Sequence, residues 1–173
     1  HKDLGQMYLT QGDVESACAE NQAGIDALRN IEDADDLRLE LDSVLAYCNY
    51  RRSGNSRAIA DLEAVADGQR KSATADPLDL ASSLIRLARM QNEERLWQAA
   101  FESAQKADKV VAGVHDQHFL RVPALVEQIR ALHALGRADD ASKAVESATD
   151  IIEKTPGLDP AYAQALSRVR QGD

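Results

Sequence analysis

Residues 132–148 read LHALGRADDASKAVESA. Apolar or small residues recur in this stretch at spacings of three and four, and a glycine interrupts the pattern at position 136. Residues spaced in this way lie on one face of an α-helix, and glycine readily adopts the positive φ of a helix C-terminus. The stretch therefore predicts two helices that meet at Gly136.

The same periodicity runs through almost the whole chain of 173 residues, and no stretch alternates at period two for long enough to predict a strand. Asp76 and Asp159 each precede a proline, which predicts an N-cap followed by proline in the first helical turn. We expect Gly12 to end a helix as Gly136 does. The breaks between periodic segments give nine predicted helices, at residues 1–11, 13–31, 36–52, 55–73, 77–91, 95–112, 119–135, 138–154 and 159–171.

One alanine recurs when the second helices of successive pairs are aligned. It stands at Ala17, Ala58, Ala100 and Ala141, which are 41 or 42 residues apart. The column seven residues later contains Gly24, Val65, Ala107 and Ala148, and the column twelve residues earlier contains Gly5, Ala46, Ala88 and Ile129. Small residues in fixed columns indicate helices that cross closely. Because one helix pair cannot bury its apolar face alone, we expect stacked pairs with one continuous core.

These columns resemble the tetratricopeptide repeat. The residues that carry the resemblance are Leu132, Gly136, Ala141, Val145 and Ala148 in the last full repeat, Leu4, Gly5, Tyr8, Gly12 and Ala17 in the first, and Leu84, Leu87, Ala88, Ala100, Ala104 and Ala107 in the third. The resemblance implies an all-α fold of antiparallel helix pairs stacked in a right-handed superhelical solenoid. It places repeats at about 1–34, 36–75, 77–113 and 119–155 and a capping helix at 159–171, in a single domain over 1–173.

The period departs from the 34 residues that are usual in this family. A period of 41 to 42 residues is similar to that of the kinesin light chain type and of repeats in bacterial signalling proteins, and the second repeat has Asn49 in the tyrosine column. A HEAT or armadillo-like repeat shares the longer period and is the alternative fold. Because the chain begins at His1 inside a periodic segment, we interpret it as a piece of a longer protein.

Charge and composition exclude several classes of function. The chain has 29 acidic and 20 basic residues and a net charge of -9, which argues against binding to nucleic acid. No run approaches the roughly 18 apolar residues that a membrane span needs, so we expect no membrane partner. We also expect a cytoplasmic location. Cys18 and Cys48 lie in helical patterns, where a buried free thiol is the common state. We therefore predict two free thiols rather than a disulfide.

No motif predicts catalysis or a cofactor. The chain contains no glycine-rich phosphate loop, nucleophile elbow, H-E-x-x-H or kinase signature. His115 and His118 are too few to hold zinc, which takes three or four protein ligands. The acidic run at residues 33–36 departs from a calcium loop because Arg38 stands where glycine is required. We expect a protein that is not an enzyme and binds no metal or cofactor.

The resemblance also implies a binding surface, because the first helix of each pair lines a concave groove in tetratricopeptide arrays. Carried onto this sequence, the groove residues are Gln6, Tyr47, Tyr50, Arg51, Arg86, Arg89, Arg130 and His133, accompanied by Lys2, Ile85, Val126 and Glu127. Arginine binds carboxylates in a bidentate manner, and tyrosine offers rigid contact area. We expect a peptide partner with acidic groups or a free C-terminus. The alternative is that the arginines are merely solvated and the tyrosines pack between repeats.

These features favour a non-catalytic module that binds a peptide or a partner protein segment in a basic groove. A second hypothesis makes the segment a regulatory or sensor tail of a multidomain bacterial signalling protein, such as a serine/threonine kinase or a transcription regulator. A third makes it a scaffold whose open ends drive self-association into a homo-oligomer.

Overall fold

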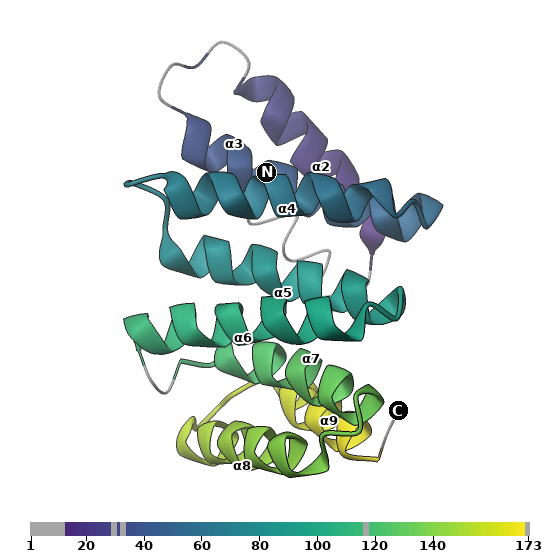
Figure 1. Cartoon of the computed structure of the whole chain (residues 1–173). Coiled ribbons are helices and arrows are strands. Elements are labelled where there is room, and N and C mark those ends of the chain that lie inside the picture. The colour runs from purple at the N-terminus through teal and green to yellow at the C-terminus, as the bar shows by residue number, and fades with distance from the viewer. Residues whose placement is uncertain (1–12, 29–30, 32–33, 116–117, 172–173) are drawn as a thin grey trace. The chain divides into compact units, whose positions relative to one another are not determined.

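The computed structural model describes residues 13–28, 31, 34–115 and 118–171. Within these ranges every regular element is an α-helix (Figure 1). The helices are α2 (Val14–Ala27), α3 (Asp35–Ser53), α4 (Arg57–Lys71), α5 (Pro77–Glu93), α6 (Trp97–Val114), α7 (Arg121–Ala134), α8 (Ala138–Lys154) and α9 (Pro160–Arg170). They correspond to the predicted helices from 13–31 onward, whereas the predicted helix at 1–11 and its end at Gly12 lie outside the described residues. In the described part of the chain, no helix is both long enough and apolar enough to cross a membrane.

Local signals explain where several helices begin and end. The Asp159 carboxylate accepts a hydrogen bond from the Ala161 N–H at 2.8 Å, with proline in the first turn of α9. The Asp76 carboxylate accepts one from the Leu78 N–H, also at 2.8 Å. Gly136 follows α7 with a φ of +71°. The predicted N-caps and the predicted glycine at the end of α7 are therefore confirmed.

The end of α4 depends on a contact that the sequence did not predict. The backbone of Ser72 is extended, with a ψ of 134°, and its hydroxyl accepts the N–H groups of Thr74 and Ala75 at 3.2 Å each. The same hydroxyl donates to Asp36 Oδ1 at 2.7 Å, and the Thr74 hydroxyl donates to Asp36 Oδ2. Helix α4 therefore ends at Lys71, two residues before its predicted end, and Asp36 at the start of α3 holds the following turn.

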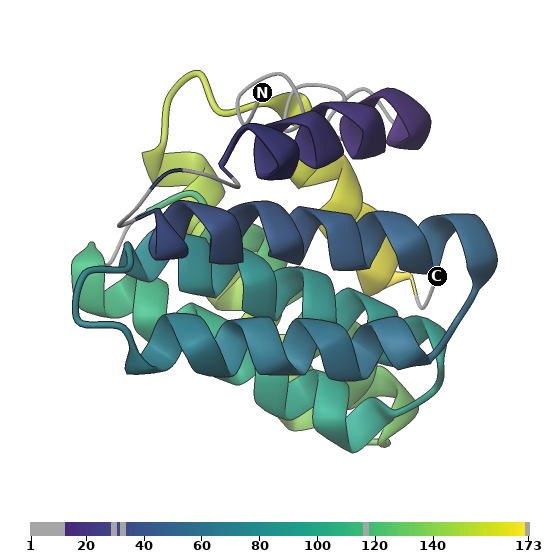
Figure 2. The ribbon, with the colours of Figure 1, turned by 90° about the horizontal axis from the view of Figure 1, so that it is seen from above.

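The chain divides into two compact units, His1–Asp79 and Leu80–Asp173. In the first unit α3 packs against both α2 and α4, and Figure 2 shows α2, in purple, alongside α3. One cluster at the contact of α2 with α3 contains Ala17 and Val44. A second cluster brings Leu28, which follows α2, against Leu41 of α3.

A disulfide joins α2 to α3, so the prediction of two free thiols is wrong. Cys18 and Cys48 form this bond, and their Cα atoms are 5.6 Å apart. That separation lies within the usual range for a disulfide. Both cysteines lie in the same buried contact as Ala17 and Val44. Helical periodicity correctly placed each cysteine on a buried helix face. It did not show that the face carrying Cys18 contacts the face carrying Cys48.

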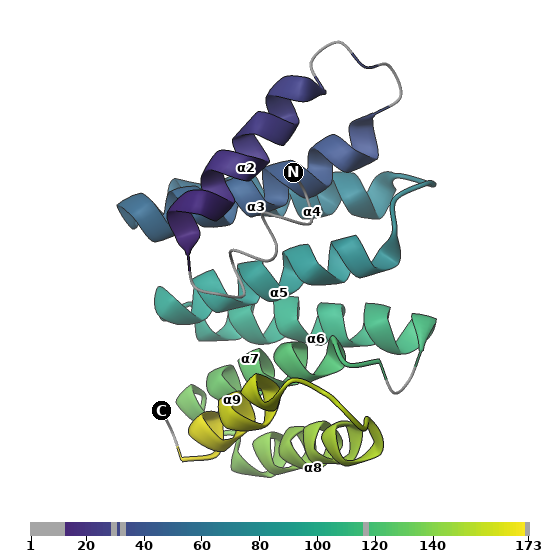
Figure 3. The ribbon, with the colours of Figure 1, turned by 180° about the vertical axis from the view of Figure 1, so that it is seen from behind.

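In the second unit α7 is the central helix. It packs against α6, α8 and α9, and Figure 3 shows α9, in yellow, next to α7 and α8. Nine of its 14 residues are buried. The main cluster of this unit contains Val122, Leu125, Val126 and Ile129 of α7, Ala144, Ala148 and Ile151 of α8, and Leu166 and Val169 of α9.

The columns of the sequence repeat are core positions in both units. The recurring alanine, at Ala17, Ala58, Ala100 and Ala141, is at most 3% exposed at every position. Seven residues later Ala107 and Ala148 are fully buried, while Val65 is partly exposed. Small side chains at these columns let neighbouring helices approach closely, as the repeat predicted.

Candidate functional site: a buried carboxylate shared by two arginines

The predicted groove residues form two groups, one in each unit. Tyr47, Tyr50 and Arg51 lie on α3 in the first unit. Arg86 and Arg89 lie on α5, and Arg130 and His133 lie on α7, in the second unit. Gln6 and Lys2 lie outside the described residues.

In the first unit the two tyrosines are core residues. Tyr47 is 9% exposed and Tyr50 is 6% exposed. Arg51, the next residue of α3, is exposed. Both tyrosine side chains therefore pack within the first unit.

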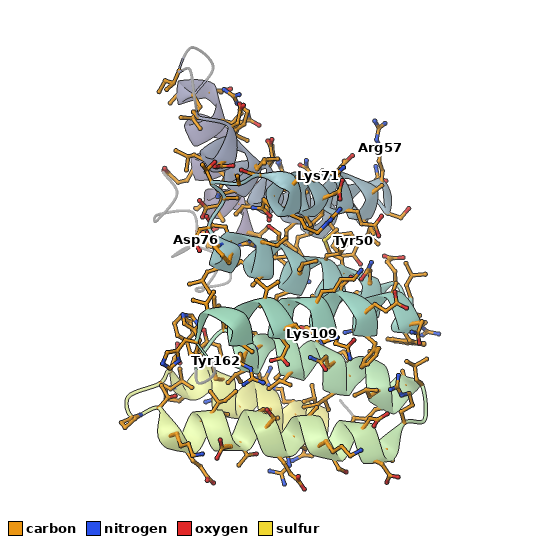
Figure 4. The ribbon with its side chains drawn as sticks, turned by 60° about the vertical axis from the view of Figure 1, so that its left-hand side comes forward. Tyr50, Arg57, Lys71, Asp76, Lys109 and Tyr162 are labelled. Atoms are coloured by element: carbon orange, nitrogen blue, oxygen red, sulfur yellow. A yellow bond between two sulfur atoms is a disulfide. The ribbon has the colours of Figure 1, made fainter. Side chains whose placement is uncertain are left out.

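The turn between α3 and α4 forms an open hollow of about 390 Å³. Arg52 lines it and pairs with Glu15 of α2, with Nε and Oε1 3.2 Å apart. Arg57 also lines it, and Figure 4 shows this side chain projecting away from the first turn of α4. Asp61 opposes these cations within the lining. Because Arg52 is paired with Glu15 and Asp61 offsets the charge of Arg57, the charges around the hollow balance and favour neither an anionic nor a cationic ligand.

In the second unit, four polar residues of α5 and α7 form what we term the Glu127 cluster: Arg89, Asn92, Glu127 and Arg130. The Glu127 side chain is 1% exposed. Its Oε1 accepts a hydrogen bond from Arg89 Nε at 2.9 Å, and its Oε2 accepts bonds from Arg130 Nη1 at 2.9 Å and Asn92 Nδ2 at 3.0 Å. Asn92 Nδ2 also donates to the Glu127 backbone carbonyl at 3.0 Å. The cluster therefore joins α5 to α7 through one carboxylate.

Burial explains why this carboxylate has so many partners. Removing an ion from water costs several kcal/mol unless charges and hydrogen bonds compensate for the loss. The two guanidinium groups and the Asn92 amide supply that compensation, while the side chains of Arg89 and Arg130 stay 41% and 37% exposed. The arginines are thus fixed at one end and reach solvent at the other. With Glu127 included, the ionic groups of the cluster carry one net positive charge.

Sequence reasoning found three members of this cluster but not their relationship. Arg89, Glu127 and Arg130 were all assigned to the groove, as separate positions on a mostly basic surface. Asn92 was not assigned there. The available signal was the spacing of three residues from Arg89 to Asn92 and from Glu127 to Arg130, which places each pair on one helix face.

Arg86 and His133, the other two predicted residues of this unit, are not among the four residues of the Glu127 cluster. Arg86 is partly buried on α5, one turn before Arg89. His133 is exposed and lines a separate open hollow of about 320 Å³, together with Glu146 of α8 and Arg170 of α9. The structure therefore brings together Arg89 and Arg130 among the predicted residues.

An aromatic contact fixes the segment before α7. The His118 and Phe119 rings stack with their centroids 4.6 Å apart, and Phe119 meets Tyr162 of α9 at 6.1 Å. Burial lowers the pKa of His118, and the nearby His115 lowers it further. Burial and the charge of Asp159 raise the pKa of Tyr162. A stacked, less basic His118 has a packing role in this segment.

The described residues thus define an all-helical protein in which successive helices pack together and a buried carboxylate is shared by two arginines. No family model matches this sequence, and the comparison with curated proteins finds no match either.

Proposed function

We propose that this protein is a non-catalytic interaction module, in which stacked helix pairs form a solenoid and the face of α5 and α7 that carries Arg89 and Arg130 binds a peptide segment of a partner protein. The observation that carries the proposal is the Glu127 cluster, where two arginines from different helices are fixed by one buried carboxylate. The buried repeat columns, and the packing of α7 against α9 as well as α6 and α8, support the stacked-pair arrangement.

The partner group that fits the Glu127 cluster is a carboxylate. Each guanidinium has five N–H donors in a planar fork, a geometry that matches carboxylate oxygens. Arg89 Nε and Arg130 Nη1 each donate a hydrogen bond to Glu127, and both side chains are partly exposed to solvent. Because the cluster has one net positive charge, a single carboxylate neutralises it. An acidic side chain or a free C-terminus supplies such a group.

The cluster is ordered before a partner arrives. Immobilising a long side chain on binding costs about 0.5–1.5 kcal/mol, and Glu127 already restrains both arginines in the unbound protein. Arg86 and His133 each lie three residues from a cluster arginine on the same helix, which is about one helical turn. We infer that they contact the residues on either side of the bound carboxylate.

A peptide array tests this function. Short acidic peptides with free C-termini are compared with the same sequences carrying Asn and Gln in place of Asp and Glu and an amidated C-terminus. The variant Arg89→Gln/Glu127→Gln/Arg130→Gln removes every charge of the cluster together, so it leaves no unpaired buried ion. We expect this variant to bind the selected acidic peptides at least about tenfold more weakly than the wild type, because charge-assisted hydrogen bonds contribute about 1.5–3 kcal/mol each.

The matched control is Arg168→Gln on α9. It changes the net charge by the same single unit at an exposed position outside the cluster, and it should bind like the wild type. Circular dichroism of both variants checks that the helices are intact. The proposal fails if the wild type does not distinguish acidic peptides from their neutral counterparts, or if the cluster variant binds as tightly as the control.

A further inference from the structure

The contact between α2 and α3 combines a covalent bond with little apolar packing. Cys18 is 3% exposed and Cys48 is fully buried, and the disulfide between them joins positions separated by 30 residues. Both cysteines belong to one of the two apolar clusters in which α2 and Leu28 contact α3. If the non-covalent packing between α2 and α3 is weak, the position of α2 depends on the disulfide.

The residues that α2 buries are small or polar. They are Ala17, Cys18, Asn21 and Gly24. Val14 and Ile25 are only partly buried, and Leu28 adds a contact just beyond the helix. By contrast, α3 buries Leu41, Val44, Tyr47 and Tyr50. Since hydrophobic stabilisation scales with the apolar area removed from water, α2 gains little from its own side chains.

A polar contact holds the C-terminal end of α2, where Arg38 Nη2 of α3 donates to the Leu28 carbonyl at 2.8 Å. Asn21 is 1% exposed, and its Nδ2 donates to the Ala17 carbonyl of its own helix, while no residue in the described part of the chain donates to its Oδ1. A buried acceptor without a partner opposes docking. Glu15 pairs with Arg52 of α3, but both side chains are more than half exposed, and exposed ion pairs contribute little. A helix of 14 residues is also marginal when it stands alone.

We propose that the Cys18–Cys48 disulfide is a redox-controlled attachment of α2: the oxidised protein holds α2 against α3, and reduction releases it while α3, α4 and the second unit stay folded. This inference is independent of the proposed peptide-binding function. Its physical basis is that the bond restricts the unfolded chain and keeps α2 close to α3, where non-covalent packing alone is weak.

The chemistry requires a dithiol reductant. One reductant thiolate attacks a protein sulfur, which breaks the protein disulfide and forms a mixed disulfide; the second thiolate then attacks the mixed disulfide. Two electrons pass to the protein, two protons end on the sulfurs of Cys18 and Cys48, and the reductant leaves as its own disulfide. Because both cysteines are buried, the attack waits for a local opening of the contact between α2 and α3.

Hydrogen exchange of the full chain tests the proposal, with dithiothreitol as the reductant and mass spectrometry as the readout. The samples are the oxidised protein, the reduced protein, and the Cys18→Ala/Cys48→Ala variant with and without dithiothreitol. We expect amides of α2 to exchange at least about tenfold faster in the reduced protein and in the variant than in the oxidised protein. Amides of α4 and α7 should be unchanged, and dithiothreitol should not affect the variant.

Two results would overturn the proposal. In one, α2 of the fully reduced protein keeps the exchange rate of the oxidised protein, which would show that packing alone holds the helix. In the other, faster exchange extends over α4 and α7, which would show that the disulfide supports the whole fold rather than one helix. Mass analysis of alkylated samples confirms the number of free thiols in each, so incomplete reduction is not mistaken for retained packing.

Discussion

At the scale of the residue, Glu127 has the largest energetic consequence in the second unit. Its side chain is 1% exposed and it accepts hydrogen bonds from Arg89, Arg130 and Asn92. The side chains of the two arginines are partly exposed, so water can replace Glu127 as their partner, whereas the buried Glu127 has no such replacement for the arginines. Removing both arginines should therefore lower the free energy of unfolding more than removing Glu127, so the effect of substitutions within the cluster is asymmetric.

This asymmetry gives a stability prediction. We expect Arg89→Met/Arg130→Met to lower the free energy of unfolding by about 3–5 kcal/mol, because it leaves a buried carboxylate with only the Asn92 amide. Adding Glu127→Met to this double variant should restore most of the loss, since an apolar group in the same place needs no charged partner. Urea unfolding followed by circular dichroism measures both values. A triple variant that is no more stable than the double variant would contradict the assigned role of Glu127.

At the scale of the element, Asp36 links the start of α3 to the turn after α4. Hydrogen bonds from Thr74 and Ser72 hold the pKa of Asp36 below its ordinary value of 3.8. A carboxyl group whose pKa is lower in the folded than in the unfolded protein adds stability above its ordinary pKa and loses it as the pH falls through the folded value. The turn after α4 is therefore expected to weaken in acid.

The prediction for this element concerns its pH dependence. Asp36→Asn should lower the free energy of unfolding of the first unit at neutral pH. As the pH falls from neutral to values below 3.8, the variant should lose less stability than the wild type, because it lacks the carboxyl group that becomes protonated. Urea midpoints measured across that range test the difference. Asp61→Asn, at an exposed position of α4, is the control for removing one acidic group. If Asp36→Asn and Asp61→Asn change the pH profile equally, the hydrogen bonds to Ser72 and Thr74 do not carry the effect.

Elements of this kind also show how far the sequence could predict the fold. Helix ends at Asp76, Gly136 and Asp159 were predictable because their causes are local: an acceptor for free N–H groups, or a backbone that needs positive φ. The repeat columns were predictable because their spacing repeats. The disulfide was not, because helical periodicity gives the face of a residue but not the residue opposite.

The candidate site was predictable only in part for the same reason. Arg89 and Arg130 were assigned to a common surface, and their side chains do meet at one carboxylate. Tyr47 and Tyr50 were assigned to that surface as well, but they are buried in the first unit. A position on an inner helix face can contact either solvent or the next helix, and the sequence does not separate these outcomes.

At the scale of the whole molecule, charge acts against the proposed partner over long distances. The chain carries a net charge of -9, whereas the ionic groups of the Glu127 cluster carry one positive charge. An acidic peptide is therefore repelled as it approaches and attracted only near the cluster. Salt screens interactions beyond the Debye length, which is about 8 Å at physiological ionic strength.

This opposition predicts an unusual salt dependence of binding kinetics. As ionic strength rises from low to physiological values, the association rate of an acidic peptide should increase, because long-range repulsion is screened. The dissociation rate should increase too, because the contacts with Arg89 and Arg130 weaken. Stopped-flow fluorescence of a peptide selected from the array measures both rates. An association rate that falls with added salt would show that local attraction dominates the approach.

The disulfide also has a mechanical consequence. The chain from Cys18 to Cys48 spans 30 positions, which as an extended strand would reach roughly 100 Å. While the bond is intact, this length cannot be stretched by a force applied to the ends of the protein. A pull on the segment before Cys18 passes through the sulfur atoms directly into α3, and the loop between α2 and α3 bears no tension. Reduction would allow the chain between Cys18 and Cys48 to be stretched, so the reduced protein would extend further under force than the oxidised protein.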